Sequence, residues 1–233
     1  MIKKNSYLYH LEELRWTILS ILFFLFIAFI FSMFFIEKII IFLQEPIKDL
    51  NIKLSYFRPE EKFLTYLKVG FFSSIFLSIP FAIIRFGYFI YPALKKNEKK
   101  YFYIFIILLP LIFYTGVFFA YKIVFPFALR FFYNFAGNNT LIPLWGISNY
   151  FDLLIMLTTA TGVVFLLPIP LIFFIKAGII SVGVIDKLRP YIIIIILIIA
   201  AIFSPPDVVS QILIAVPLYL LFELSVIIGK IIK

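Results

Sequence analysis

Long apolar runs separated by short polar connections dominate the hydrophobic pattern of this chain. Most of the runs approach the ~20 consecutive apolar residues that a helix needs to cross a bilayer. The pattern therefore predicts an all-α integral membrane protein, in which residues 1–233 form a single domain of six transmembrane helices. The six expected spans are residues 17–36, 69–91, 103–125, 150–175, 191–203 and 208–228.

The distribution of positive charge predicts the orientation of these spans. An even number of spans places both termini on the same side of the membrane. That side holds 13 of the 21 lysines and arginines, and cytoplasmic connections are enriched in such residues. We therefore expect both termini in the cytoplasm. On the other side lies a long connection, 37–68, for which we expect an extension of the first helix that ends before Pro46 and short helices over the outer face.

The fifth run is shorter than the others. Residues 191–203 would form about 20 Å of helix, whereas the hydrocarbon core is ~30 Å thick. The turn SPPD follows at once, at residues 204–207. We therefore expect the last two helices to form a short hairpin.

Composition narrows the functional classes. Hydrophobic residues make up 64% of the chain and charged residues 14%, and the net charge of +9 suits lysines that face anionic lipid, without any nucleic acid. With no cysteine and one histidine, the sequence contains no recognisable catalytic motif or set of metal ligands. We expect no enzyme activity, no metal and no cofactor.

Two alternative functions must be weighed at this stage. A small-solute secondary transporter would show an inverted repeat and polar residues at the membrane midplane, and we find neither. An intramembrane enzyme would need a polar catalytic set, which is also missing from the sequence.

The segment HLEELRWT, residues 10–17, places two glutamates at the start of the first span. In a helix, Glu12 can pair with Arg15 three residues later. Glu13 has no fixed cation in reach, so we interpret it as a free carboxylate at the membrane interface. The alternative is that it is an ordinary solvated charge.

A further acid, Glu98, lies within the lysine-rich segment KKNEKK. This connection follows the second span on the side where Glu13 precedes the first, so both carboxylates lie at the same level. Carboxylates bind guanidinium groups in a bidentate geometry, and the spacing permits these two to receive two arginines. Neutralisation of the neighbouring lysines is the alternative role for Glu98.

The segment SPPDVVSQ, residues 204–211, carries polar residues where the last span begins. Ser204 and Asp207 fit a capping box, with Ser204 as the cap. Gln211 lies one turn further on the same face, and a buried amide in a membrane helix often bonds to another helix. We expect such a role for Gln211. Glu223, near the far end of the same span, would be satisfied by snorkelling to the interface.

Five segments, in order between residues 10 and 228, carry a resemblance to a known family. They are HLEELRWTIL, FIYPALKKNEKK, GVFFAYKIVFPFAL, DKLRPYIII and SPPDVVSQILIAVPLYLLFELSV. Together they resemble TatC, the multispanning receptor subunit of the twin-arginine protein translocase. The resemblance implies a cupped bundle of six helices with two short final helices.

The resemblance also implies a function and a site. It implies that the cytoplasmic face binds the twin-arginine signal peptides of folded export proteins. The implied binding residues are Glu13, Arg15, Phe89 and Glu98.

The resemblance implies partners as well. Single-span subunits of the TatA and TatB type are expected to dock near Ser204, Asp207 and Gln211, self-association is expected, and the proton-motive force would supply the energy. The implied location is the plasma (inner) membrane of a bacterium or an organelle inner or thylakoid membrane. One departure concerns Leu166, because many members carry a polar residue at that position.

Overall fold

The computed structural model confirms the all-α fold class. It describes residues 7–48, 50, 52–93, 96–135, 144–167, 169, 171–172, 175, 182–202 and 207–232. The chain divides into two compact units, which are described separately below. Unit 1 comprises Met1–Leu43 and Arg58–Leu111, and unit 2 comprises Gln44–Phe57 and Ile112–Lys233.

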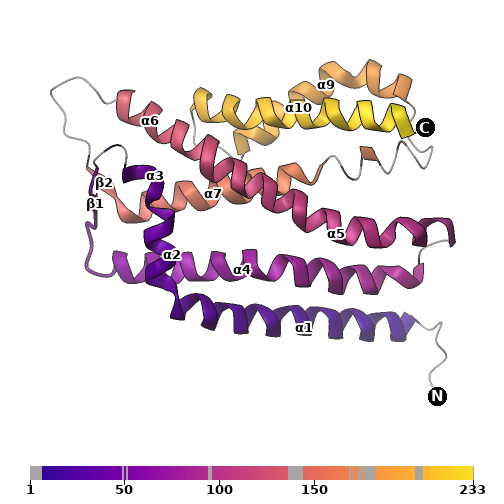
Figure 1. Cartoon of the computed structure of the whole chain (residues 1–233), viewed down its shortest axis with the longest axis horizontal. Helices are drawn as coiled ribbons and strands as arrows, with labels where there is room; N and C mark the ends of the chain where they lie inside the picture. The colour runs from indigo at the N-terminus through magenta and orange to yellow at the C-terminus, as the bar shows by residue number, and fades with distance from the viewer. Residues whose placement is uncertain are drawn as a thin grey trace. The chain divides into compact units, whose positions relative to one another are not determined.

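Unit 1 is built around two long helices, α1 (Tyr7–Phe34) and α4 (Glu61–Ile90). They run antiparallel and lie side by side over most of their length (Figure 1). The Met33 side chain of α1 packs on Gly70 of α4, where a Cβ atom would lie 2.6 Å from the Met33 sulfur. Small residues of this kind allow close helix packing in membranes, where the apolar surface itself gives little preference for one neighbour.

The other elements of unit 1 lie at its two ends. At one end, α1 stops at Phe34 and the separate short helix α2 (Ile36–Leu43) follows. At the other end, α4 leads into the 3₁₀ turn η1 (Tyr91–Ala93), after which α5 (Lys96–Phe119) begins. We call this second end the α4–α5 end of unit 1.

Unit 2 has α7 (Ile147–Phe165) at its core, with Phe151 and Leu157 fully buried. The π-helix η2 (Ala120–Val124) joins α5 to α6 (Phe125–Phe135), and both η2 and α6 pack on α7.

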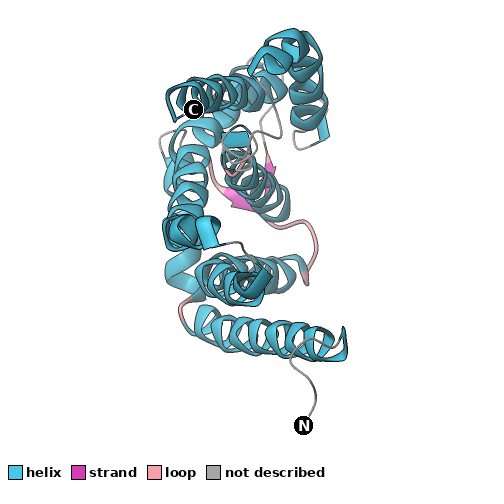
Figure 2. Cartoon of the chain, turned by 90° about the vertical axis from the view of Figure 1, so that its right-hand side faces the viewer, coloured by secondary structure: helices cyan, strands magenta, loops and turns pink. Residues whose placement is uncertain are grey.

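Unit 2 also contains two long helices near the chain's end and three short elements. The long helices are α9 (Val182–Ile202) and α10 (Val208–Ile232), which pack against each other as an antiparallel hairpin. The short elements are α3 (Glu45–Lys48) and the parallel strands β1 (Leu54–Ser55) and β2 (Trp145–Gly146), which Figure 2 shows in magenta.

The π-helix has a local cause in the sequence. Within it, the Phe125 amide bonds to the Ala120 carbonyl, five residues back. The next residue is Pro126, which has no N–H and whose ring would collide with the Lys122 carbonyl in a regular α-helix. The wider turn accommodates this ring, so the helix continues through the proline instead of ending.

Glycines set the contact between the last turn of α5 and α7. A Cβ atom on Gly116 would lie 2.9 Å from the backbone oxygen of Thr161 and 2.8 Å from Phe165 Cβ. A Cβ atom on Gly162 would lie 2.7 Å from the Phe113 ring. Each helix therefore supplies a glycine against which the other packs.

The described helices can be compared with the expected spans. Five of the helices in the described part of the chain are long and apolar enough to cross a membrane, which makes this a multi-pass membrane protein by length and composition. Residues 191–203 do not form a helix of their own, because α9 already begins at Val182 and carries charged residues in its first half. The count of six spans and the cytoplasmic termini therefore remain predictions.

The expectation for the long outer connection was partly wrong. The first helix does not extend to Pro46, because α1 ends at Phe34 and the chain turns into α2. Pro46 lies inside α3, within its first turn, where a missing N–H costs no helical bond. The short helices α2 and α3 were expected, whereas the strands β1 and β2 were not.

Candidate functional site

The α4–α5 end of unit 1 contains the residues expected to bind a signal peptide. The register between the antiparallel helices α1 and α4 shows which residue after Arg85 lies beside Glu13. Ser20 of α1 bonds to Arg85 of α4, and one turn further along α1 Phe24 stacks on Phe81, with ring centroids 4.4 Å apart. Because the helices are antiparallel, seven residues back from Ser20 correspond to seven residues on from Arg85. Glu13 therefore lies level with Pro92, inside η1.

Glu13 has an unusual environment at this level. Its side chain is 32% exposed, yet its Oε2 oxygen is buried and has no hydrogen-bond partner among the described residues. The Nδ1 atom of His10 lies 3.9 Å from this oxygen, too far for a hydrogen bond. A buried carboxylate oxygen without a donor is unfavourable, so the site has the capacity to accept a hydrogen bond from a ligand.

The neighbours of Glu13 differ from the simplest expectation. Glu12 and Arg15 are both exposed, and the structure forms no ion pair between them. The side chain of Trp16 is 63% exposed, as is common for tryptophan at a membrane–water interface. Arg15 is therefore held near Glu13 by the helix alone.

Aromatic residues form the other part of this end. The Tyr91 ring lies 4.8 Å from the Phe102 ring, and the Lys99 ammonium group lies 4.7 Å above Tyr91. These contacts pack η1 against the first turns of α5. Phe89, in the last turn of α4, is half-buried.

For Glu98 the structure describes the backbone only. Glu98 is the third residue of α5, in the first turn of the helix, where the helix dipole favours a carboxylate. Its side chain lies outside the part of the structure that is described, so the convergence of Glu13 and Glu98 remains a prediction.

Arg85, in the last two turns of α4, has a hydrogen-bond partner on α1. Its Nε donates a hydrogen bond to Ser20 Oγ at 2.9 Å, and the Ser20 hydroxyl donates to the Thr17 carbonyl at 2.8 Å. This polar bridge joins α1 to α4 about two turns from Glu13. The sequence signals for it are a serine in one apolar run and an arginine in another, but many such serines bond to their own helix.

The second candidate site is the turn of the α9–α10 hairpin. Here the capping box predicted for Ser204 is wrong, because α10 begins at Val208 and Asp207 is the cap. Asp207 Oδ1 accepts a hydrogen bond from the Ser210 amide at 2.7 Å, the usual N-cap bond. The other oxygen, Oδ2, is buried and has no partner among the described residues. Ser204 itself lies outside them.

The expected contact of Gln211 with another helix is confirmed. Its Nε2 donates to the backbone oxygen of Leu197 in α9 at 3.0 Å. The amide therefore joins α10 to α9 near the hairpin turn. Leu166 occupies the position at which many TatC-like proteins carry a polar residue. It is the C-cap of α7, and its side chain is apolar.

Taken together, the structure describes a helical membrane protein whose two candidate sites lie near helix ends. Among the residues that it describes, no group of three or more histidine, aspartate or glutamate side chains could hold a metal ion. These features fit a membrane protein that recognises or moves another molecule.

Comparison with known proteins identifies the family. The model of the family "Sec-independent protein translocase protein (TatC)" matches residues 9–217. The chain is 35% identical to TatC of Magnetococcus marinus over 95% of this chain and 82% of that one. It is 30% identical to TatCy of Bacillus subtilis over 98% of this chain and 90% of that one.

A solved structure agrees. The crystal structure of the twin-arginine translocase receptor TatC superposes with a TM-score of 0.81 at 31% identity, over 96% of this chain and 99% of that one. The chain belongs to the TatC family. It is a component of a Sec-independent protein translocase, a multi-pass membrane protein and not an enzyme.

Proposed function

We propose that this chain is the receptor core of a twin-arginine export system and binds twin-arginine signal peptides at the α4–α5 end of unit 1. The observation that carries the proposal is the buried Oε2 oxygen of Glu13, which has no hydrogen-bond donor among the described residues. A guanidinium group supplies several donors in a planar fork and suits such a carboxylate better than an ammonium group does.

Each of the proposed residues has a distinct task. Glu13 binds one arginine of the signal, and Glu98, in the first turn of α5, binds the other. Phe89, half-buried at the end of α4, supplies apolar surface to the residues that follow the arginines. Arg15, exposed two residues after Glu13, repels a misplaced arginine and keeps the pairing in register.

A pair of adjacent glutamates provides the test of Glu13. We expect Glu13→Gln to weaken the binding of a synthetic twin-arginine peptide by about tenfold, the effect of losing one charge-assisted hydrogen bond. Glu12→Gln removes the same charge from the neighbouring exposed position and should leave the affinity unchanged. Binding can be measured by fluorescence anisotropy on the purified protein in detergent. Equal affinities for the two variants would overturn the assignment.

We propose further that the turn of the hairpin contacts single-span subunits of the TatA and TatB type. The support is that polar groups at this turn can bond to a partner helix. Asp207 Oδ2 is buried without a partner among the described residues, and Gln211 lies one turn further on. Ser204 precedes them in the chain. Intramembrane polar groups of this kind often bond to a neighbouring helix.

Gln211→Leu tests this contact. We expect the variant to co-purify less of the single-span partner while it binds the twin-arginine peptide as tightly as the wild type does. Loss of peptide binding with intact partner association would instead assign Gln211 to the receptor site.

The remaining parts of the proposal concern the setting. We propose six spans, both termini in the cytoplasm and a location in the inner membrane of a bacterium, with the proton-motive force as the energy source and no cofactor. The support is the excess of lysine and arginine on the side of the termini. Self-association belongs to the same proposal.

A further inference from the structure

The open end of the hairpin, where α9 begins and α10 ends, carries a cluster of four charged side chains. Arg189 of α9 lies between two acids, with Nη2 3.2 Å from Glu223 Oε2 of α10 and Nε 3.2 Å from Asp186 Oδ1 of its own helix. The contact with Asp186 is an ion pair whose angle does not make it a hydrogen bond. Lys230 of α10 lies 3.7 Å from the other oxygen of Asp186.

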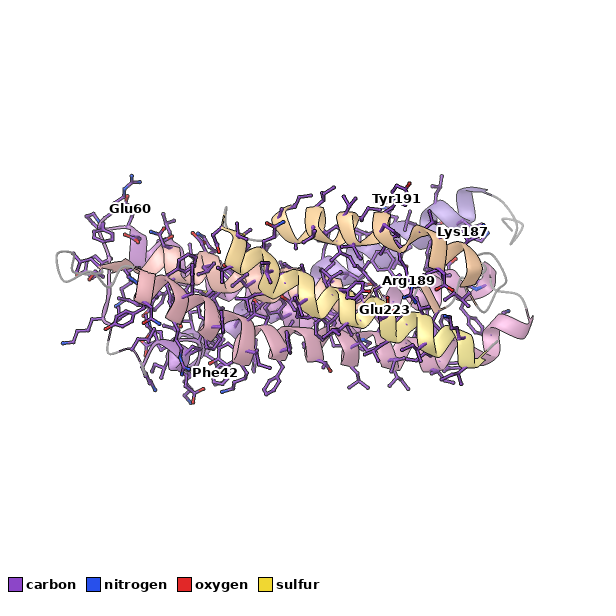
Figure 3. All side chains as sticks on the ribbon, turned by 90° about the horizontal axis from the view of Figure 1, so that it is seen from above. Phe42, Glu60, Lys187, Arg189, Tyr191 and Glu223 are labelled. Carbon is purple, nitrogen blue, oxygen red and sulfur yellow. The ribbon has the colours of Figure 1, made fainter. Side chains whose placement is uncertain are left out.

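Of these four side chains, Arg189 and Glu223 are partly shielded from solvent, whereas Asp186 and Lys230 are exposed. The Glu223 side chain is 21% exposed, and Tyr219 donates a hydrogen bond to its Oε1 at 2.9 Å. Figure 3 shows Arg189 directed from α9 towards Glu223, whereas Lys187 and Tyr191 lie away from α10. The pair is therefore formed by one face of α9.

An apolar cluster lies beside the ion pair. Ile185 of α9, Val226 of α10 and Ile175 are almost completely buried and pack together. The ion pair and this cluster hold the same end of the two helices. Burial of this kind strengthens the attraction between the charges relative to an exposed pair.

The position of Glu223 along α10 shows that the pair is not an ordinary surface contact. Glu223 lies eight residues, or about 12 Å of helix, before the end of the apolar segment Val208–Ile231. A charged side chain within a membrane-spanning segment is unfavourable unless it is paired, and such residues commonly mark functional sites.

We infer that Arg189 and Glu223 form an ionic latch that fixes the open end of α9 on α10. The Gln211–Leu197 hydrogen bond fixes the turn end of the same two helices. With both ends held, α9 has one register on α10, and the face that carries Asp207 and Gln211 keeps a single geometry. Arg189 and Glu223 are thus positioning residues for partner contact, an inference that rests on the function proposed for that face.

When the latch opens, Arg189 and Glu223 each keep one polar contact on their own helix. When α9 moves away from α10, Arg189 keeps Asp186, which is on its own helix, and Glu223 keeps the Tyr219 hydroxyl. Each side therefore retains a partner in the open state. This arrangement lowers the cost of release compared with an isolated pair, whose separation would expose two unpaired charges.

The first test measures the latch without any ligand or partner. The chain contains no cysteine, so Val226→Cys introduces a single thiol at a position that is 1% exposed. On this background, we expect Glu223→Gln and Arg189→Gln each to raise the rate of labelling by a small thiol reagent about fivefold. Their combination should raise it no further, because both remove the same contact. Lys187→Gln removes a charge from the same helix, and its rate should equal that of the background.

Labelling rates for Glu223→Gln and Arg189→Gln equal to that of Lys187→Gln would overturn the latch.

The second test measures association with the single-span partner, with Gln211→Leu as the reference for lost partner association. We expect Glu223→Gln to weaken partner association in the same direction and to leave binding of the twin-arginine peptide unchanged. If Gln211→Leu weakens association and Glu223→Gln does not, the positioning role is wrong while the proposed function stands. If neither weakens it, the proposed partner face itself is wrong.

Discussion

At the scale of single residues, the two candidate sites share one chemical feature. Glu13 and Asp207 each hold one carboxylate oxygen that is buried and has no hydrogen-bond partner among the described residues. Both lie at the end of an apolar helix. The sequence predicted Glu13 to be a free carboxylate, whereas it placed Asp207 after the cap and not at it. The burial of the two oxygens was not predicted, because it depends on which atoms of neighbouring helices cover them.

Asp207 provides a prediction at this scale. Asp207→Ala removes the bond to the Ser210 amide and should lower the free energy of unfolding by about 1 kcal/mol, the usual cost of a lost N-cap. Asp207→Asn retains an acceptor oxygen and should be nearly neutral. Thermal unfolding in detergent micelles compares the two variants, and equal losses would show that the cap does not stabilise α10.

Two glycines provide another prediction. Gly116→Ala places a Cβ atom 2.9 Å from the Thr161 backbone oxygen, so α5 and α7 must move apart, and we expect a loss of about 1–3 kcal/mol. Gly183→Ala is the matched control, because a Cβ atom there would meet nothing within 4 Å. Thermal unfolding of both variants checks this, and similar stabilities would contradict the close approach of the two helices.

At the scale of elements, the apolar pattern predicted most of the long helices but not all of their limits. The pattern could not place the start of α9, because Asp186 and Arg189 interrupt the apolar run. The helix continues through these residues since they pair with each other and with α10. The capping signal at Ser204 was misread for a related reason. Asp207 also satisfies the capping rule, and the sequence does not indicate which of the two candidates, three residues apart, begins the helix.

The bridge between α1 and α4 provides a prediction for this scale. Ser20→Ala leaves the Arg85 guanidinium without its bond to α1 and should lower the free energy of unfolding by about 1–3 kcal/mol. Ser20→Thr keeps the hydroxyl and should restore most of the loss. If the threonine variant is as unstable as the alanine variant, the hydroxyl is not what stabilises the helix pair.

At the scale of the whole molecule, the family and the fold class were both accessible from the sequence. Five segments between residues 10 and 228, in the same order as in the family, carried the resemblance. The solved TatC structure agrees over 96% of the chain. The division into two units and the small sheet of β1 and β2 were not accessible, because both arise from contacts between segments far apart in the chain.

The orientation in the membrane is a prediction for the whole molecule. A membrane-impermeant thiol reagent added to intact cells should label Glu60→Cys, which lies in the long outer connection, and should not label Lys187→Cys. Both positions are exposed, and no native cysteine competes. The reverse pattern would place the termini outside the cytoplasm.

The most direct test of the central claim compares twin-arginine and twin-lysine signal peptides on two proteins, the wild type and the variant Glu13→Ala with Glu98→Ala. The account predicts that the wild type prefers the arginine peptide and that the double variant binds both peptides equally weakly. The preference would then depend on the two carboxylates, as guanidinium recognition requires. An arginine preference that persists in the double variant would contradict the account, because the arginines would then be bound elsewhere.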